Sequence, residues 1–253
     1  MRFLSSLVVL FLVSAPGFNA QAANEWKNPD AQEPPKKRRV TPAAPPRQAP
    51  PPAPAPTQAS VPAPVLEGQL SLQAVRVCNY QLSYVDKGSG GKIDGSFYLP
   101  GIPDGYAMIG AYAQGNYDKP SDCILAVKPA NEQSISLLQI PGNWNRVWTD
   151  KGSGASMDGS IWHPTPQSNN YVCLGSIAKK GYKQPNLSNY VCVHRCLVES
   201  IPVNYPVWST KGTGSKQKTN VYKLHNSNSF FAVPGKNSPA SLTDIKGNMS
   251  CSF

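Results

Sequence analysis

Residues 86–96 read DKGSGGKIDGS, and residues 150–160 read DKGSGASMDGS. Eight of these eleven positions are identical, and no gap is needed to align them. A shorter copy, KGTG, begins at Lys211, so the lysine recurs after 64 and then after 60 residues. Self-similarity at such a period is typical of a fold assembled from repeated structural units.

The flanking aromatic residues repeat in the same register. One aromatic residue stands three positions before each lysine, and another stands eleven positions after it. The six residues are Tyr84, Trp148 and Trp208 on the near side, and Tyr98, Trp162 and Tyr222 on the far side. Because they persist even in the weaker third copy, we interpret them as core residues rather than as platforms for stacking sugars.

Each unit of about 60 residues has the pattern of a small antiparallel sheet. Apolar and polar residues alternate between the turns, as they do in half-buried strands, and residues 70–253 hold no helical period over three turns. One such sheet cannot bury its own inner face, whereas three can if these faces meet. The sequence therefore predicts an all-β fold, a β-prism with pseudo-threefold symmetry; a trefoil or short propeller is the alternative. The expected repeats are about 70–129, 130–197 and 198–253.

Residues 1–22 have the pattern of a secretory signal peptide. Arg2 supplies the positive start, Phe3 to Val13 form an apolar run, and Ala20-Gln21-Ala22 offers small residues for cleavage. The run is shorter than the ~20 residues that span a bilayer, so no transmembrane segment is expected. We expect cleavage near Ala22 and a protein secreted to an extracellular or periplasmic space.

A spacer follows over residues 23–65, before a domain over 66–253. Twelve of the 26 prolines fall between Pro34 and Pro64, which predicts a disordered, extended segment that would offer a site to a protein partner. Its basic run, Lys36 to Arg39, resembles a nuclear localisation signal, but in an exported chain we interpret it as a solvated basic cluster.

The formal net charge of +10 is spread over all three parts. The leader carries +1, the spacer 6 − 3 = +3, and residues 66–253 carry 17 − 11 = +6. A moderately basic domain favours anionic partners such as phospholipid or acidic polysaccharide. No nucleic-acid motif accompanies the charge, so no nucleic-acid partner is expected.

The middle repeat resembles a known family. The residues that carry the resemblance are Val147-Trp148-Thr149-Asp150-Lys151-Gly152-Ser153-Gly154, Ser160-Ile161-Trp162-His163-Pro164 and Tyr171-Val172-Cys173-Leu174-Gly175. They resemble the vacuolar protein sorting-associated protein 62 family and, more distantly, the β-prism module associated with multivesicular-body subunits. The resemblance covers roughly residues 70–253. It implies a non-enzymatic β-prism module linked to membranes or trafficking, of a kind that also accompanies pore-forming proteins.

The segments 86–95, 150–159 and 210–219 are longer than the 2–5 residues of ordinary hairpin loops. Pseudo-symmetry places all three at one end of the prism, where they would form a binding surface. The candidate ligand-binding residues are Asp86, Lys87, Ser89, Asp94, Asp150, Lys151, Ser153, Asp158, Lys211, Lys216 and Lys218.

The paired acids of the first two loops have two interpretations. Asp86 with Asp94, and Asp150 with Asp158, accept hydrogen bonds from a sugar or ligate calcium, or else they cap their own loops through backbone amides. The third copy has no acid at either position. Its lysines lead to the hypothesis of contact with anionic lipid headgroups, against the alternative of an ordinary solvated face.

Six cysteines in an exported domain predict disulfides. The expected pairs are Cys173–Cys192, on adjacent strands of one unit, Cys78–Cys251, closing the ring of sheets, and Cys123–Cys196 by elimination. Cys192, His194 and Cys196 alternate along one segment, and we interpret the cysteines as disulfide partners rather than metal ligands.

No catalytic residue or cofactor is predicted. The three histidines occupy non-equivalent positions, and no nucleophile elbow accompanies them. The sequence thus favours an exported, non-catalytic module that binds a membrane surface, through anionic lipid, or a glycan by its Gly-Ser-Gly loops. The alternative is a structural or protein–protein adaptor, as in a toxin or secretion assembly.

Overall fold

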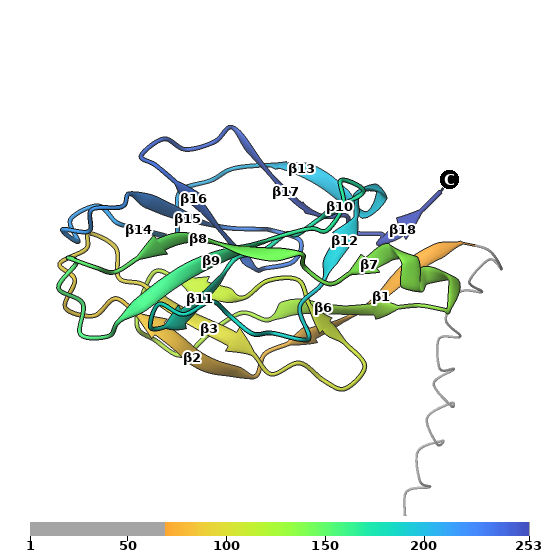
Figure 1. Ribbon diagram of the computed structural model, residues 1–253, viewed down its shortest axis with the longest axis horizontal. Helices are drawn as coiled ribbons and strands as arrows, with labels where there is room; N and C mark the ends of the chain where they lie inside the picture. Colours follow the sequence, from red (N-terminus) through yellow and green to blue (C-terminus); the bar gives the residue numbers. More distant parts are fainter. Residues whose placement is uncertain (1–68, 253) are drawn as a thin grey trace, which may run out of the picture. The chain divides into compact units, whose positions relative to one another are not determined.

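The computed structural model describes residues 69–252. The expected signal peptide, the spacer and its basic run lie outside the described residues. Within 69–252, the regular structure consists of eighteen strands and two short 3₁₀ helices (Figure 1). The strands pair into several small antiparallel sheets, which confirms the all-β class. A threefold prism arrangement of these sheets stays a prediction.

Three of the sheets repeat one pattern, with the strand after a glycine-rich segment in the middle. Their strand orders are β2-β3-β5, β8-β9-β11 and β14-β15-β16. A β-bulge interrupts the pairing just before Tyr84 and again just before Trp148, which are equivalent positions in the first two repeats. The bounds are β2 Tyr80–Val85, β3 Ser96–Pro100, β5 Tyr112–Gln114, β8 Asn143–Thr149, β9 Gly159–Thr165, β11 Ile177–Lys180, β14 Trp208–Ser209, β15 Thr219–Lys223 and β16 Phe230–Pro234.

The remaining strands form a second set of sheets, ordered β18-β1-β6-β4, β10-β12-β7 and β13-β17. In Figure 1 their labels lie mostly to the right, away from the loops that follow β2, β8 and β14 at the left end. Their bounds are β1 Leu70–Val77, β4 Ala107–Met108, β6 Ile124–Pro129, β7 Leu138–Gln139, β10 Tyr171–Val172, β12 Cys192–His194, β13 Val198–Pro202, β17 Ser241–Ile245 and β18 Ser250–Cys251. The 3₁₀ helices are η1, Gln133–Leu137, and η2, Arg195–Leu197.

The repeated aromatic residues form the centre of the core. Tyr84, Trp148 and Trp208 are each fully buried. The ring centroid of Trp148 lies 5.6 Å from that of Tyr84 and 5.0 Å from that of Trp208. Phe97 contacts both Tyr84 and Trp208, at 5.7 and 5.4 Å, so residues from all three repeats meet in one cluster. Such tilted and edge-on contacts are the geometry that aromatic pairs prefer.

Two glycines make room for these rings. A β-carbon on Gly159 would lie 2.1 Å from the Tyr84 ring, and one on Gly95 would lie 2.3 Å from the Trp208 ring. The ring in each case belongs to another repeat. The middle residue of the repeated DGS motif is therefore glycine because a neighbouring aromatic ring fills the space that a side chain would need there.

The structure has the disulfides Cys78–Cys123, Cys173–Cys192 and Cys196–Cys251. The second is the pair expected from the sequence, whereas the expected pairs Cys78–Cys251 and Cys123–Cys196 are wrong. The first and last strands are indeed neighbours, but Cys251 is opposite Leu70 at the start of β1. Cys78 lies eight residues farther along, about 26 Å away at ~3.3 Å per residue.

Strand register explains the observed pairing. Val77 at the end of β1 is opposite Ile124 at the start of β6, so the next residues outward, Cys78 and Cys123, face each other. Their Cα atoms are 4.4 Å apart. The sequence pattern predicted that the strand ending at His194 continues through Cys196. Instead, Cys196 lies in the 3₁₀ helix η2.

His163 on β9 packs edge-on against Phe231, with ring centroids 4.5 Å apart. Its Nδ1 atom lies 3.3 Å from the Ser176 hydroxyl, which also accepts the Ala232 amide. Burial lowers the pKa of His163 to about 4, from 6.5. The imidazole is therefore neutral at pH 7.

We expect Gly159→Ala to lower the free energy of unfolding by about 1–3 kcal/mol, because the added methyl group overlaps the buried Tyr84 ring. Gly247→Ala is the matched control, since a β-carbon at Gly247 has no neighbour within 4 Å. Denaturant unfolding of both variants measures the difference, and equal stability of the two would contradict the proposed packing constraint.

Acid should destabilise the protein through His163. Its pKa is lower in the folded than in the unfolded state, so the unfolded chain takes up the proton first as the pH falls. Stability present above pH 6.5 is then lost progressively towards pH 4, by about 3 kcal/mol at ~1.36 kcal/mol per pKa unit. The variant His163→Leu replaces the imidazole by leucine, which is the residue at the equivalent position of the first repeat, Leu99. Unfolding curves from pH 7 to pH 4 should show a shallower loss for this variant than for the unsubstituted protein.

Candidate functional site

Each glycine-rich loop is closed by its first residue. In the first loop, the Gly95 amide donates to Asp86 Oδ1 at 2.8 Å, and the Asp86 amide donates to the Gly95 carbonyl at 3.0 Å. Asp150 and Gly159 make the same two bonds in the second loop, at 2.9 and 3.1 Å. The two aspartates are 1% and 5% exposed. They therefore cap their loops in the way expected of Asp in turns.

The third loop makes the same closure without an acid. The Thr219 amide donates to Thr210 Oγ1 at 3.0 Å, and the Thr210 amide donates to the Thr219 carbonyl at 3.0 Å. A hydroxyl oxygen thus takes the place of a carboxylate oxygen. This substitution explains why the third copy tolerates the loss of the acid that starts the other two loops.

The inner polar residues of the loops are buried as well. Ser89 Oγ accepts from the Gly91 amide at 3.1 Å, and Ser153 Oγ accepts from the Ala155 amide at 3.2 Å. Thr213 does the same for Ser215 at 3.2 Å. Ser89, Ser153 and Thr213 are each under 8% exposed. The middle residue of the Gly-Ser-Gly motif therefore faces its own loop.

Asp86 also joins the first loop to the rest of the domain. Its Oδ2 accepts from Trp208 Nε1 at 2.7 Å and from Ser89 Oγ at 3.2 Å, while its Oδ1 accepts from Tyr117 Oη at 2.9 Å. Burial, together with the adjacent Asp86 carboxylate, raises the pKa of Tyr117, so its hydroxyl stays a donor. Both oxygens of Asp86 are thus engaged by protein groups.

The three loops pack against one another. The Ser156 amide of the second loop donates to the Lys87 carbonyl of the first at 2.8 Å, and the Lys92 amide of the first donates to the Lys211 carbonyl of the third at 2.9 Å. Gly212 permits this approach, because a β-carbon there would lie 2.8 Å from the Gly90 carbonyl oxygen. We call the joined segments 86–95, 150–159 and 210–219 the loop platform.

Lysines dominate the exposed side chains of the loop platform. Six lysines are exposed, whereas Asp94 and Asp158 are the exposed acids. The lysines are Lys87, Lys92, Lys151, Lys211, Lys216 and Lys218. The third loop carries three of them and no acid, so its formal charge is +3. The platform therefore presents a positive surface with its capping acids turned inward.

The loop platform borders a cavity of about 620 Å³ beside the third loop. Lys211, Lys218 and Lys236 line it together with Ile93 of the first loop and Tyr205. Tyr205 is 95% exposed, which is unusual for a large aromatic side chain. Within the described residues, this cavity combines positive charge with apolar surface.

The outer acids have neighbours of a different kind. Asp158 Oδ1 accepts from Tyr182 Oη at 3.1 Å, and the ring of Tyr182 lies 4.8 Å from Lys151 Nζ. The structure thus places Asp86 and Asp150 inside the loops and Asp94 and Asp158 outside them. Sugar or calcium binding by these acids stays a prediction.

A second cluster of candidate ligands combines His194, Cys196 and Cys251, which is the one group in residues 69–252 close enough to share a metal ion. Cys196 and Cys251 form a disulfide, so their sulfur atoms are not thiolates. Cys192, the third residue of the segment considered from the sequence, bonds to Cys173.

Sequence reasoning missed Tyr117 and Tyr182, which contact the loop acids from outside the loops. It also missed Ser215, whose Oγ accepts a hydrogen bond from Trp148 Nε1 at 3.0 Å. The equivalent indole nitrogen, that of Trp208, donates to Asp86. The recurrence of the two tyrosines 65 residues apart was a usable signal. The tryptophan partners come from other repeats, and no local pattern marks them.

The sequence profile of the vacuolar protein sorting-associated protein 62 family matches residues 50–235. The chain belongs to this family. None of the curated proteins compared with it matches it. The similar solved structure is the crystal structure of GNIP1Aa from Chromobacterium piscinae, with 28% sequence identity and a TM-score of 0.60.

That likeness covers 72% of this chain and 37% of GNIP1Aa, so the chain spans little more than a third of the length of that protein. The family and the structural likeness both fit a non-catalytic module. The three disulfides are consistent with an extracellular protein. Among the described residues, no helix has the length and apolar composition needed to cross a membrane.

The cap of the second loop can be tested with an isosteric pair. Asp150→Thr should fold stably, because Thr210 already performs this closure in the third loop. In Asp150→Val the side chain has the shape of threonine but no hydrogen-bond acceptor, so the buried Gly159 amide is left unpaired. We expect it to be less stable than Asp150→Thr by about 1–3 kcal/mol in denaturant unfolding. Equal stability of the two variants would show that the cap contributes nothing.

Proposed function

We propose that the domain is a non-catalytic module that attaches to an anionic membrane surface through the lysines of the loop platform. The observation that supports this proposal is the distribution of charged side chains. Six lysines are exposed on the platform, while Asp86 and Asp150 are buried as loop caps. These two acids therefore lie behind the exposed lysines, and Asp94 and Asp158 are the platform acids at the surface that a membrane would meet.

The geometry supports surface attachment more than recognition of sugar hydroxyls by the loops. Asp86 uses both carboxylate oxygens within the protein, and Ser89 and Ser153 bond their own loops. The lysine ammonium groups have fewer contacts within the protein: Lys218 Nζ donates to the Ser215 carbonyl at 2.8 Å, and Lys151 Nζ lies 4.8 Å from the centre of the Tyr182 ring. A rigid platform with outward ammonium groups suits a flat array of phosphates.

The expected strength follows from the charge count. Each lysine near an anionic surface contributes about 1 kcal/mol, and the attraction falls off within a Debye length. The third loop, with its formal charge of +3, should supply most of the binding, because Asp94 and Asp158 partly offset the lysines of the other two loops. Binding should accordingly weaken as the salt concentration rises.

The test is co-sedimentation of the full chain with vesicles of phosphatidylcholine alone or with added phosphatidylserine. We expect binding only with phosphatidylserine. The double variant Lys211→Gln, Lys216→Gln should bind about 30-fold more weakly, the equivalent of about 2 kcal/mol. The charge-matched control is Arg76→Gln, Arg146→Gln, which removes two exposed cations outside the loops and should bind as the unsubstituted protein does.

Binding that is insensitive to salt and to the lysine substitutions would overturn the proposal. Retention by an immobilised acidic polysaccharide that is lost in the Lys211→Gln, Lys216→Gln variant, without vesicle binding, would assign the platform to a glycan instead. Equal losses in the two double variants would mean that only the net charge of the protein matters.

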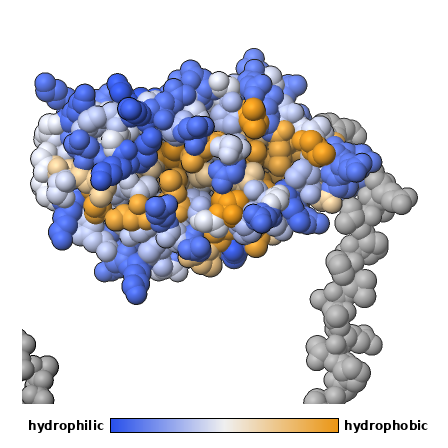
Figure 2. Space-filling view, turned by 60° about the horizontal axis from the view of Figure 1, so that its bottom comes forward, coloured by the Kyte–Doolittle hydropathy of each residue, from blue (hydrophilic) through white to orange (hydrophobic). Residues whose placement is uncertain are grey.

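An adaptor role has one observation in its favour. Figure 2 shows hydrophobic residues running along the middle of one face of the domain, with hydrophilic residues around them. Among the described residues, Ile135 and Ile140 are each 61% exposed. Apolar surface of this kind is typical of contacts between proteins. An adaptor would bind neither vesicle composition in the sedimentation experiment.

A further inference from the structure

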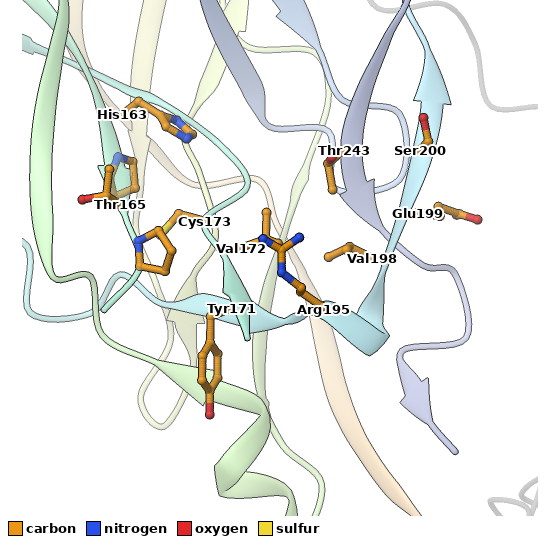
Figure 3. A pocket seen from close by; sticks show the side chains of 12 residues that line it. His163, Thr165, Tyr171, Val172, Cys173, Arg195, Val198, Glu199, Ser200 and Thr243 are labelled. Carbon is orange, nitrogen blue, oxygen red and sulfur yellow. The ribbon is translucent and has the colours of Figure 1, made fainter. Parts of the chain in front are cut away.

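A second cavity, of about 360 Å³, lies apart from the loop platform. It is bordered by the end of β9, by β10, by η2 and by the antiparallel pair of β13 and β17, so it lies where the second and third repeats meet (Figure 3). Its volume is within the ~300–1,000 Å³ range of small-ligand sites. Nothing in the loop platform lines it.

Arg195 is the cation of this cavity. Its guanidinium points into the space between the strands in Figure 3. The Arg195 amide donates to the Asn170 carbonyl at 2.9 Å, and the side-chain Nε donates to the Asn169 carbonyl. These two bonds hold the residue in place and leave the terminal nitrogens of the guanidinium directed at the cavity.

The acid beside it is turned away. Glu199 points out of the cavity in Figure 3, and its Oε1 accepts from Asn226 Nδ2 at 2.8 Å. Glu199 therefore does not neutralise Arg195 within the cavity. Since a guanidinium pairs with a carboxylate through two parallel hydrogen bonds, the site favours a ligand that carries a carboxylate.

Two hydroxyl groups lie on one wall of the cavity. Ser200 on β13 is directly opposite Thr243 on β17, which places both side chains on one face of this strand pair. Thr165 at the end of β9 lies on the other side of the cavity, and its hydroxyl donates to the Asn143 carbonyl at 3.4 Å (Figure 3). The Ser200 and Thr243 hydroxyls can donate and accept hydrogen bonds, as a polyhydroxylated ligand requires.

The remaining walls are apolar or uncharged. Val172, Val198 and Pro164 line the cavity with the ring of His163. Because His163 is neutral at pH 7, Arg195 is the charged group that faces the ligand. An apolar wall beside hydroxyl groups suits a sugar ring, which has an apolar face and polar edges.

The other repeats lack this combination. Leu99 occupies the position of His163 in the first repeat, and Lys223, which pairs with Asp122 at 2.5 Å, occupies it in the third. Pro129 occupies the position of Arg195 in the first repeat, because the pair Ala107–Val127 matches the pair Val172–Val193. Residues needed only for the fold recur among the repeats, so this departure is not explained by the fold.

We propose that the cavity binds a carboxylate-bearing sugar, such as a uronic or sialic acid, with Arg195 pairing with the carboxylate. Ser200 and Thr243 bond the sugar hydroxyls. The apolar wall covers one face of the ring. This site is independent of membrane attachment by the loop platform, and either proposal can fail without the other.

The test is calorimetric titration of the full chain with glucuronic acid and with N-acetylneuraminic acid. Glucose and the methyl esters of both acids are the matched ligands without a carboxylate. We expect the acids to bind at least about 10-fold more tightly than these ligands, since a lost charge-assisted pair costs at least that much. Acetate, which offers a carboxylate without a sugar ring, should not bind measurably.

Variants assign the interaction. Arg195→Gln should lose at least about 10-fold in affinity for the acids, and Arg195→Lys should recover part of the loss. Arg76→Gln is the control and should bind as the unsubstituted protein does, because it removes one exposed cation that does not line the cavity. Thermal unfolding of each variant verifies that the fold is kept.

Several outcomes would overturn the proposal. One is no heat of binding for either acid at millimolar concentration. Another is equal affinity for the acids and for glucose, which would remove Arg195 from the recognition. A third is binding of a short peptide through its terminal carboxylate with no binding of the sugars, which would assign the cavity to a peptide.

Discussion

The contact of Tyr84, Trp148 and Trp208 is the constraint on which the rest of the structure depends. These rings come from three different repeats, and two of them pack on glycines of a neighbouring repeat, Gly159 and Gly95. A single repeat therefore cannot complete its core, as is general for repeated sheets that hide one face. Each ring stands two residues before the start of a glycine-rich loop, so the same contact that closes the core also brings the loops together.

Repetition in the core leaves freedom at the loops. The nitrogen of Trp208 reaches a carboxylate of Asp86, whereas that of Trp148 reaches the hydroxyl of Ser215. Thr210 closes the third loop with a hydroxyl, where Asp86 closes the first with a carboxylate. A polar oxygen is all that the fold requires at these places. Because the charge is not required, the third loop can lose its acids and carry +3 without a cost in structure.

Much of the fold could be predicted from the sequence, because the repeat and its aromatic residues report directly on burial. The all-β class follows from them. The disulfides Cys78–Cys123 and Cys196–Cys251 could not, because they depend on how β1 aligns with β6 and β18, and register has no signal in one sequence. The burial of Asp86 was missed for a similar reason: sequence shows a polar loop residue, but not that the neighbouring loops and Trp208 cover it.

The residues that recur and those that do not have different roles. A position filled alike in all three repeats has a task that every repeat must perform, such as the buried aromatic before each loop. At a position where the repeats have different residues, the fold does not require one particular side chain. His163 faces a cavity where the first repeat has Leu99, and Arg195 faces the same cavity where the first repeat has Pro129. The fold therefore needs neither His163 nor Arg195 at these positions, and the second repeat is free to use them for binding.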